Sequence, residues 1–65
     1  MKLEYARWPE FVAQMEAVII NWGFSFWKSD SYDGESTPSV YLYRRGRWVL
    51  NLNFHFGEVE LFLFN

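Results

Sequence analysis

The chain contains no cysteine and only one histidine, His55, among its 65 residues. The missing thiols exclude disulfide bonds and thiolate metal sites, and a single imidazole cannot build a histidine-rich metal site. The sequence also has no Gly-rich phosphate loop, nucleophile elbow or zinc-ligand spacing. We therefore expect no catalytic centre, no metal and no cofactor.

The chain also lacks a strong charge of either sign and any long hydrophobic run. Six basic and eight acidic side chains give a formal charge of -2. This balance is too mild for bulk attraction to nucleic acid, and also for a DNA-mimicking protein. The apolar runs are far shorter than the ~20 residues that span a bilayer, and none after Met1 is typical of a signal peptide. We expect a soluble, cytoplasmic protein without a membrane segment.

Aromatic side chains are abundant and make up 23% of the chain. A chain of this length buries only about 60% of the surface that its unfolded form exposes. Small domains without disulfide bonds gain stability from unusually apolar packing or from oligomerisation. The composition therefore predicts one small domain over residues 1–65 with an aromatic core. It is also compatible with self-association.

A helical pattern precedes the only stretch of loop composition. Pro9 suits a first helical turn, where its missing N–H costs nothing, and Gly23 can supply the left-handed residue that closes a helix. We predict a helix over residues 9–22. Its apolar stripe recurs at spacings of three and four residues and comprises Trp8, Phe11, Val12, Met15, Val18, Ile19 and Trp22.

Strand patterns dominate the rest of the chain. Short aromatic or alternating segments cover residues 24–28, 39–43, 47–54 and 59–64, and the alternation is clearest in the third of them. Residues 29–38 are rich in turn formers and predict a flexible loop. The simplest arrangement is α+β, with the helix packed on one face of a four-stranded antiparallel meander, αββββ.

The first tight turn can be tested for register. Residues 44–46, Arg-Arg-Gly, favour a three-residue hairpin loop with glycine in the left-handed position. This loop places Leu42 opposite Trp48 and gives a uniformly apolar face. A two-residue loop at Arg45-Gly46 would bring Tyr41 and Tyr43 into that face instead. Because a slip of one residue moves every side chain to the other face, we predict the three-residue loop.

The second tight turn, over residues 55–58, gives a consistent result. An apolar face continues into the last strand when three pairs lie opposite one another, Phe54 with Val59, Leu52 with Leu61 and Leu50 with Leu63. The two registers together predict one coherent core face.

The opposite face of this predicted sheet keeps large apolar side chains. It should present Tyr41, Tyr43, Val49, Phe62 and Phe64, with Trp27 nearby, although a water-facing sheet normally alternates cleanly with polar residues. Contiguous apolar patches of this kind mark interfaces. We interpret the face as a binding surface for a protein partner or for a second copy. The alternative is that strand twist or the N-terminal segment buries the two phenylalanines in the core.

Arg44, Arg45 and Arg47 are half of the basic residues and cluster at one predicted hairpin tip. Guanidinium groups bind carboxylates and phosphates bidentately. The cluster predicts either a charged rim that orients a partner or a phosphate contact, and a solvated turn is the plainer alternative. Beside Tyr41 and Tyr43 it is similar to the aromatic and basic sheets that bind single-stranded RNA.

Two acidic groups are weaker candidates. His55 lies near Glu58 and Glu60, but general acid–base catalysis also needs a substrate pocket, so we interpret it as a turn histidine beside carboxylates.

Asp30, Asp33 and Glu35 bracket Gly34 without the spacing of a calcium loop. We interpret that segment as solvated.

In size and in its lack of catalytic motifs, the chain resembles small inhibitor and accessory proteins of phages and mobile elements, including anti-CRISPR and anti-restriction proteins. The resemblance covers this general type and implies steric blocking of a protein partner, which needs a surface and no catalytic group. We predict a non-enzymatic protein-interaction module. The alternatives are a single-stranded nucleic-acid binder and a structural homodimer.

Overall fold

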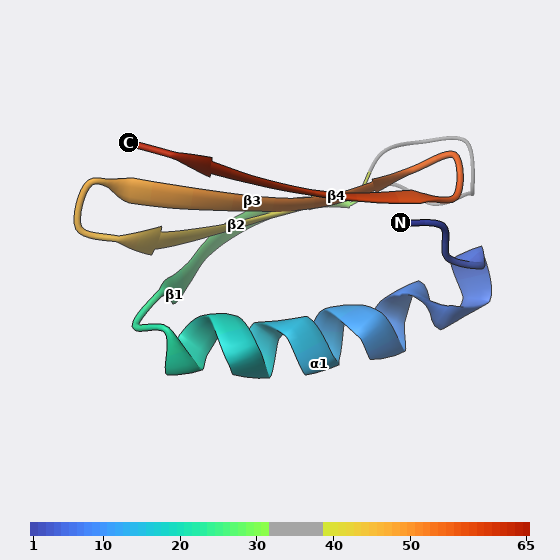
Figure 1. Ribbon diagram of the computed structural model, residues 1–65, viewed down its shortest axis with the longest axis horizontal. Helices are drawn as coiled ribbons and strands as arrows, with labels where there is room; N and C mark the ends of the chain where they lie inside the picture. Colours follow the sequence, from blue (N-terminus) through green and yellow to red (C-terminus); the bar gives the residue numbers. More distant parts are fainter. Residues whose placement is uncertain (32–38) are drawn as a thin grey trace.

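The computed structural model describes residues 1–31 and 39–65 and confirms the predicted α+β arrangement. One long helix lies along one face of a four-stranded antiparallel sheet of order β1-β2-β3-β4 (Figure 1). Residues 29–31 of the predicted flexible loop belong to a strand instead, and residues 32–38 lie outside the described part of the chain. The elements are η1 (Tyr5–Arg7), α1 (Trp8–Asn21), β1 (Ser25–Ser31), β2 (Ser39–Arg45), β3 (Trp48–His55) and β4 (Glu58–Phe64).

Helix α1 begins and ends close to the predicted bounds. Pro9 lies in the first turn, and the Trp22 N–H donates to the carbonyl oxygens of Val18 and Ile19 at the other end. Gly23 then turns the chain out of the helix at a φ of 94°, a conformation that glycine adopts without strain. The predicted apolar stripe is only partly buried, because Val18 and Trp22 are exposed.

The hairpin between β3 and β4 has the predicted register. Phe54 lies opposite Val59, Leu52 opposite Leu61 and Leu50 opposite Leu63. The turn itself is tighter than expected, since Phe56 and Gly57 alone connect the strands. Both have positive φ, 50° and 76°, as the central residues of a type I′ turn require.

The predicted register between β2 and β3 is wrong. Arg45 pairs with Trp48 and Tyr43 pairs with Leu50, so Gly46 and Arg47 form a two-residue turn. The glycine has a φ of 58°, which fits the first central position of such a turn. This register moves Tyr41 and Tyr43 to the helix side of the sheet.

The reason for this register is the amphipathic character of the tyrosine side chain. Tyr43 is fully buried, and its hydroxyl donates a 2.8 Å hydrogen bond to Oε2 of Glu16 on α1. A tyrosine ring can therefore fill the core while its polar tip keeps a partner. The predicted three-residue loop would place both tyrosines on the opposite face, where Tyr43 could not reach Glu16.

The core lies between α1 and the two central strands. The Trp8 ring stacks on Phe54, with centroids 5.0 Å apart and planes 19° from parallel, and it also contacts Tyr41. Aromatic pairs at such distances add to the free energy of burial. The buried hydrophobic cluster is Trp8, Val12, Ile19, Phe24, Tyr43, Leu50, Leu52 and Phe54.

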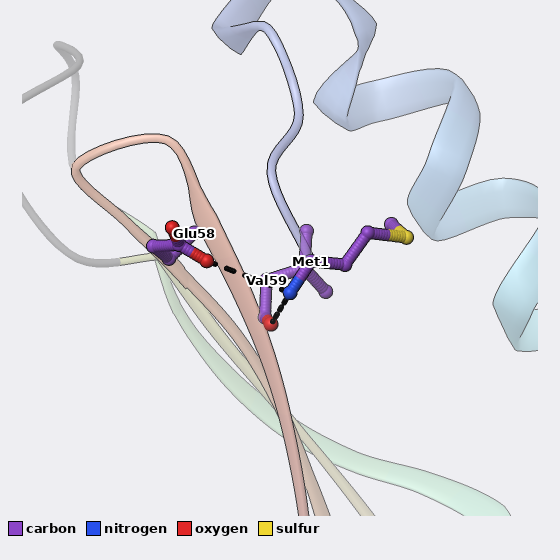
Figure 2. A network of polar contacts seen from close by, with 3 residues as sticks. All are labelled: Met1, Glu58 and Val59. Atoms are coloured by element: carbon purple, nitrogen blue, oxygen red, sulfur yellow. Dashed lines mark hydrogen bonds and ion pairs between the residues drawn. The ribbon is translucent and has the colours of Figure 1, made fainter.

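The N-terminal residues extend the sheet beside the first residues of β4. The Leu3 N–H donates to the Gly57 carbonyl oxygen at 2.8 Å, and the Val59 N–H donates to that of Met1 at 2.7 Å. The Met1 ammonium group also lies 3.5 Å from Oε2 of Glu58 (Figure 2). This ion pair is exposed, so it contributes about 1 kcal/mol at most.

The N-terminal segment does not cover the outer phenylalanines. Tyr5 and Trp8 contact Phe54 on the helix side of the sheet. Phe62 and Phe64 stay 42% and 52% exposed. The alternative in which this segment buries them in the core is therefore wrong.

Candidate binding face of the sheet

The face of the sheet opposite α1, here called the outer face, is the candidate site. Among residues 1–31 and 39–65, no other element covers it (Figure 1). Strand alternation, the three registers and the ring contacts of Trp27 define its members. They are Trp27, Lys28, Asp30, Val40, Leu42, Arg44, Val49, Asn51, Asn53, His55, Glu58, Glu60, Phe62 and Phe64.

Three of the five predicted interface residues meet on this face. Val49 lies directly opposite Phe64 on the neighbouring strand, and the Phe62 and Phe64 ring centroids are 6.2 Å apart. Tyr41 and Tyr43 do not join them, because the observed register turns both toward α1. The predicted interface residues that remain on the outer face therefore belong to β3 and β4.

A second aromatic group lies on β1. The Arg44 guanidinium carbon is 4.9 Å from the Trp27 ring centroid, and the Lys28 ammonium nitrogen is 4.5 Å from it. Both distances are within the range of cation–π attraction. The pairing with β2 shifts between Phe26 and Lys28, as at a β-bulge. Strand alternation alone does not reveal this bulge, so the sequence predicted Trp27 near the outer face but not its contacts with Arg44 and Lys28.

The three arginines do not form one clamp. Arg44 belongs to the outer face, whereas Arg45 Nη1 donates a 2.9 Å hydrogen bond to the Trp22 carbonyl oxygen at the end of α1. Arg47 lies in the turn, where it lines a shallow groove with Trp48 and Arg45. Only Arg44 is therefore placed to orient a partner on the outer face.

Polar groups occupy the middle and one end of the same face. Asn53 donates a 3.1 Å hydrogen bond to Asn51 through its side-chain amide. His55 lies opposite Glu58 in the ladder, and its ring is 4.2 Å from that of Phe56. Within the described ranges, no group of three or more histidine and carboxylate side chains could hold a metal ion. Asp33 and Glu35 of the suggested cation loop lie outside those ranges.

Phe56 is a candidate that the sequence interpretation missed. It is 67% exposed at the tip of the β3–β4 hairpin and has a φ of 50°. Bulky residues are outliers in this region of backbone space, and strain of this kind clusters at functional sites. The signal was present in the sequence, because a Phe-Gly pair stands where a tight hairpin favours Asn-Gly or Asp-Gly.

No family model matches the chain, and comparison with curated proteins and with solved structures finds no match either. No helix of the described residues is long and apolar enough to cross a membrane.

Proposed function

We propose that this protein is a non-enzymatic binding module that blocks a protein partner sterically with its outer face. The observation that carries the proposal is the contiguous apolar surface of Val49, Phe62 and Phe64 on a sheet face that no described element covers. A sheet face in water normally carries polar side chains. Apolar patches with a polar rim are typical of interaction sites.

The two cations beside Trp27 favour carboxylates on the part of the partner that covers the β1–β2 side, whereas Glu58 and Glu60 on β4 favour cations at the other end of the face. Arg44 and Lys28 place two cations at the Trp27 ring on the β1–β2 side of the face. Complementary charges at a rim steer association more than they slow dissociation. Arg44→Glu is therefore expected to lower the association rate constant more than it raises the dissociation rate constant. Equal effects on both constants would contradict this orienting role.

Phe56 extends the proposed surface to the hairpin tip. An aromatic side chain that is this exposed can enter a cavity of a partner, and such anchors supply much of the energy of many interfaces. The mechanism is the one implied by the resemblance to anti-CRISPR and anti-restriction proteins. Blocking of this kind requires a surface and no catalytic group.

Site-specific photo-crosslinking in cells that express the protein tests the proposal. A benzoyl-phenylalanine at Phe64 reports on the outer face, and one at Ala17, on the exposed side of α1, is the matched control. We expect one discrete adduct from position 64 that mass spectrometry shows to contain another protein, that co-expressed parent protein removes and that the co-expressed Arg44→Glu variant does not. An adduct from position 17 alone would mean that the helix recognises the partner.

A second candidate function is single-stranded nucleic-acid binding, and the Trp27 cluster favours it. Exposed aromatic rings beside cations on an open sheet are typical of stacking platforms. Fluorescence polarisation with a labelled oligonucleotide separates the two functions. A nucleic-acid site loses affinity steeply as salt rises and is lost in Trp27→Ala, whereas an aromatic protein interface is nearly insensitive to salt.

A further inference from the structure

The two edge strands of the sheet, β1 and β4, differ in how far they are protected against pairing with a strand of another molecule. Strand β1 has a bulge at Trp27 and carries Lys28 and Asp30, and bulges and charges are devices that prevent edge pairing. Strand β4 has neither over residues 61–64. All four of its side chains there are large, apolar and exposed, at 47% for Leu61, 42% for Phe62, 56% for Leu63 and 52% for Phe64.

The hydrogen bonds of the N-terminal segment show which backbone groups of β4 face the edge. The Gly57 carbonyl group points toward Leu3 and the Val59 N–H group points toward Met1, both away from β3. Backbone direction alternates along an antiparallel strand, so Leu61 and Leu63 direct their N–H and C=O groups to the same side. Within the described part of the chain, no backbone partner lies on that side beyond Met1.

We propose that a second copy of this chain pairs with β4 in an antiparallel, two-fold symmetric ladder centred on Phe62. In this register Leu61 of each copy lies opposite Leu63 of the other, and each such pair exchanges two N–H···O=C bonds. All edge-facing groups of the two leucines are then satisfied. Met1 already occupies the place opposite Val59, so the paired stretch is residues 60–64.

The side chains favour a copy of the same strand as the occupant. Leucine lies against leucine on the helix side of the extended sheet, and Phe62 lies against its own counterpart on the outer side. Apolar cross-strand pairs of this kind stabilise a sheet, and no like charges face each other directly. The four half-exposed residues of both copies bury at most about 1,000 Å² together, which is the size range of weak, transient interfaces. We therefore expect dimerisation that depends on concentration.

This self-pairing does not depend on the proposed partner of the outer face. Trp27 and Arg44 lie on the β1–β2 side of the sheet, away from the β4 edge. The Arg44→Glu variant therefore tests the partner site, and variants at Leu63 test the edge. Failure of one proposal is then distinguishable from failure of the other.

Sedimentation equilibrium from micromolar to millimolar concentration tests the pairing. We expect the parent protein and Trp27→Ala to dimerise alike and Leu63→Pro to stay a folded monomer. Proline is tolerated on an edge strand where the lost N–H faces outward, so the ladder with β3 stays intact. A parent that is monomeric throughout, or a folded Leu63→Pro variant that dimerises like the parent, would overturn the proposal.

A second variant decides the matter if Leu63→Pro does not fold. The Leu61→Lys, Leu63→Lys double variant places four ammonium groups at the pairing site, while the backbone stays unchanged. A folded monomer by circular dichroism and sedimentation supports the pairing. A folded dimer of unchanged affinity contradicts it.

Disulfide trapping tests the register, because the natural chain has no cysteine. Phe62 lies opposite its own counterpart as a non-hydrogen-bonded pair with Cα atoms ~4.5 Å apart, within the range that a disulfide spans. We expect Phe62→Cys to form a linked dimer at least tenfold faster than Glu60→Cys, which lies on the same strand and face. Equal rates would exclude this register.

Discussion

The Tyr43 hydroxyl donates a 2.8 Å hydrogen bond to the Glu16 carboxylate, which joins the centre of the sheet to the middle of α1. The tyrosine ring is fully buried and packs edge-on against Phe26. A polar group at this depth needs a partner, because an unpaired buried hydroxyl destabilises the fold. This one contact therefore selects the face on which β2 presents its tyrosines.

Removing the hydroxyl tests this role. Tyr43→Phe keeps the ring and loses the hydrogen bond, so we expect the free energy of unfolding to fall by about 1 kcal/mol. Glu16→Gln keeps an acceptor oxygen and should cost less. Urea denaturation followed by tryptophan fluorescence measures both. A Tyr43→Phe variant as stable as the parent would mean that the ring alone fixes the register.

The same contact predicts a stability loss at high pH. Burial raises the pKa of Tyr43 above its ordinary value of 10.0, and the hydrogen bond to Glu16 adds to the shift. Because the unfolded tyrosine ionises first, this stabilisation is full below about pH 10 and is lost as pH rises toward the folded pKa. The difference in free energy of unfolding between the parent and Tyr43→Phe should therefore shrink above about pH 10. A constant difference up to pH 11 would contradict the shift.

The sequence predicted the element order and one hairpin register correctly, and the reasons are physical. In β3, apolar and polar positions alternate, so the pairing of Phe54 with Val59 is the one that aligns its apolar face with the aliphatic residues Val59, Leu61 and Leu63 of β4. In β2 the tyrosines satisfy either face, and Gly46 suits either loop length. Contacts with distant parts of the chain distinguish the registers, above all the bond of Tyr43 to Glu16 and the packing of Tyr41 on Trp8.

The candidate site was predicted only in part, because the sequence pattern determines the register of only one of the two hairpins. Val49, Phe62 and Phe64 belong to the hairpin whose register the pattern determines. Trp27 depends on a bulge that leaves no mark in the alternation. The separation of Arg44 from Arg45 follows from the misjudged turn.

Two glycines with positive φ should respond differently to substitution. At Gly46, φ is 58° and an added Cβ meets nothing within 4 Å, so Gly46→Ala should cost about 1–2 kcal/mol from the backbone alone. At Gly23, φ is 94° and a Cβ would lie 3.3 Å from Nε of Arg45. Gly23→Ala should cost more, because it also disturbs the bond between Arg45 and the Trp22 carbonyl. Thermal unfolding compares the two, and equal costs would contradict this order.

We expect the Phe56 side chain to contribute to partner binding and to lower the stability of the fold. Asparagine tolerates the left-handed region and is favoured at the first position of a type I′ turn. We expect Phe56→Asn to raise the free energy of unfolding by about 0.5–1 kcal/mol and to weaken the partner adduct formed from position 64. Gly57, the next turn residue, stays as it is. A variant that is less stable than the parent would show that the phenylalanine ring supports the fold.

The most direct test of the central claim is the free energy of unfolding of a Phe62→Ser, Phe64→Ser double variant, measured at low protein concentration. If the outer face is a binding surface, the variant should fold cooperatively and lose no more than about 2 kcal/mol, since both rings are already half-exposed. Phe54→Ser, which alters the buried core, is the comparison and should lose about 3–5 kcal/mol. A double variant that unfolds, or that loses as much as the core variant, would show that these phenylalanines belong to the core and would contradict the proposed function.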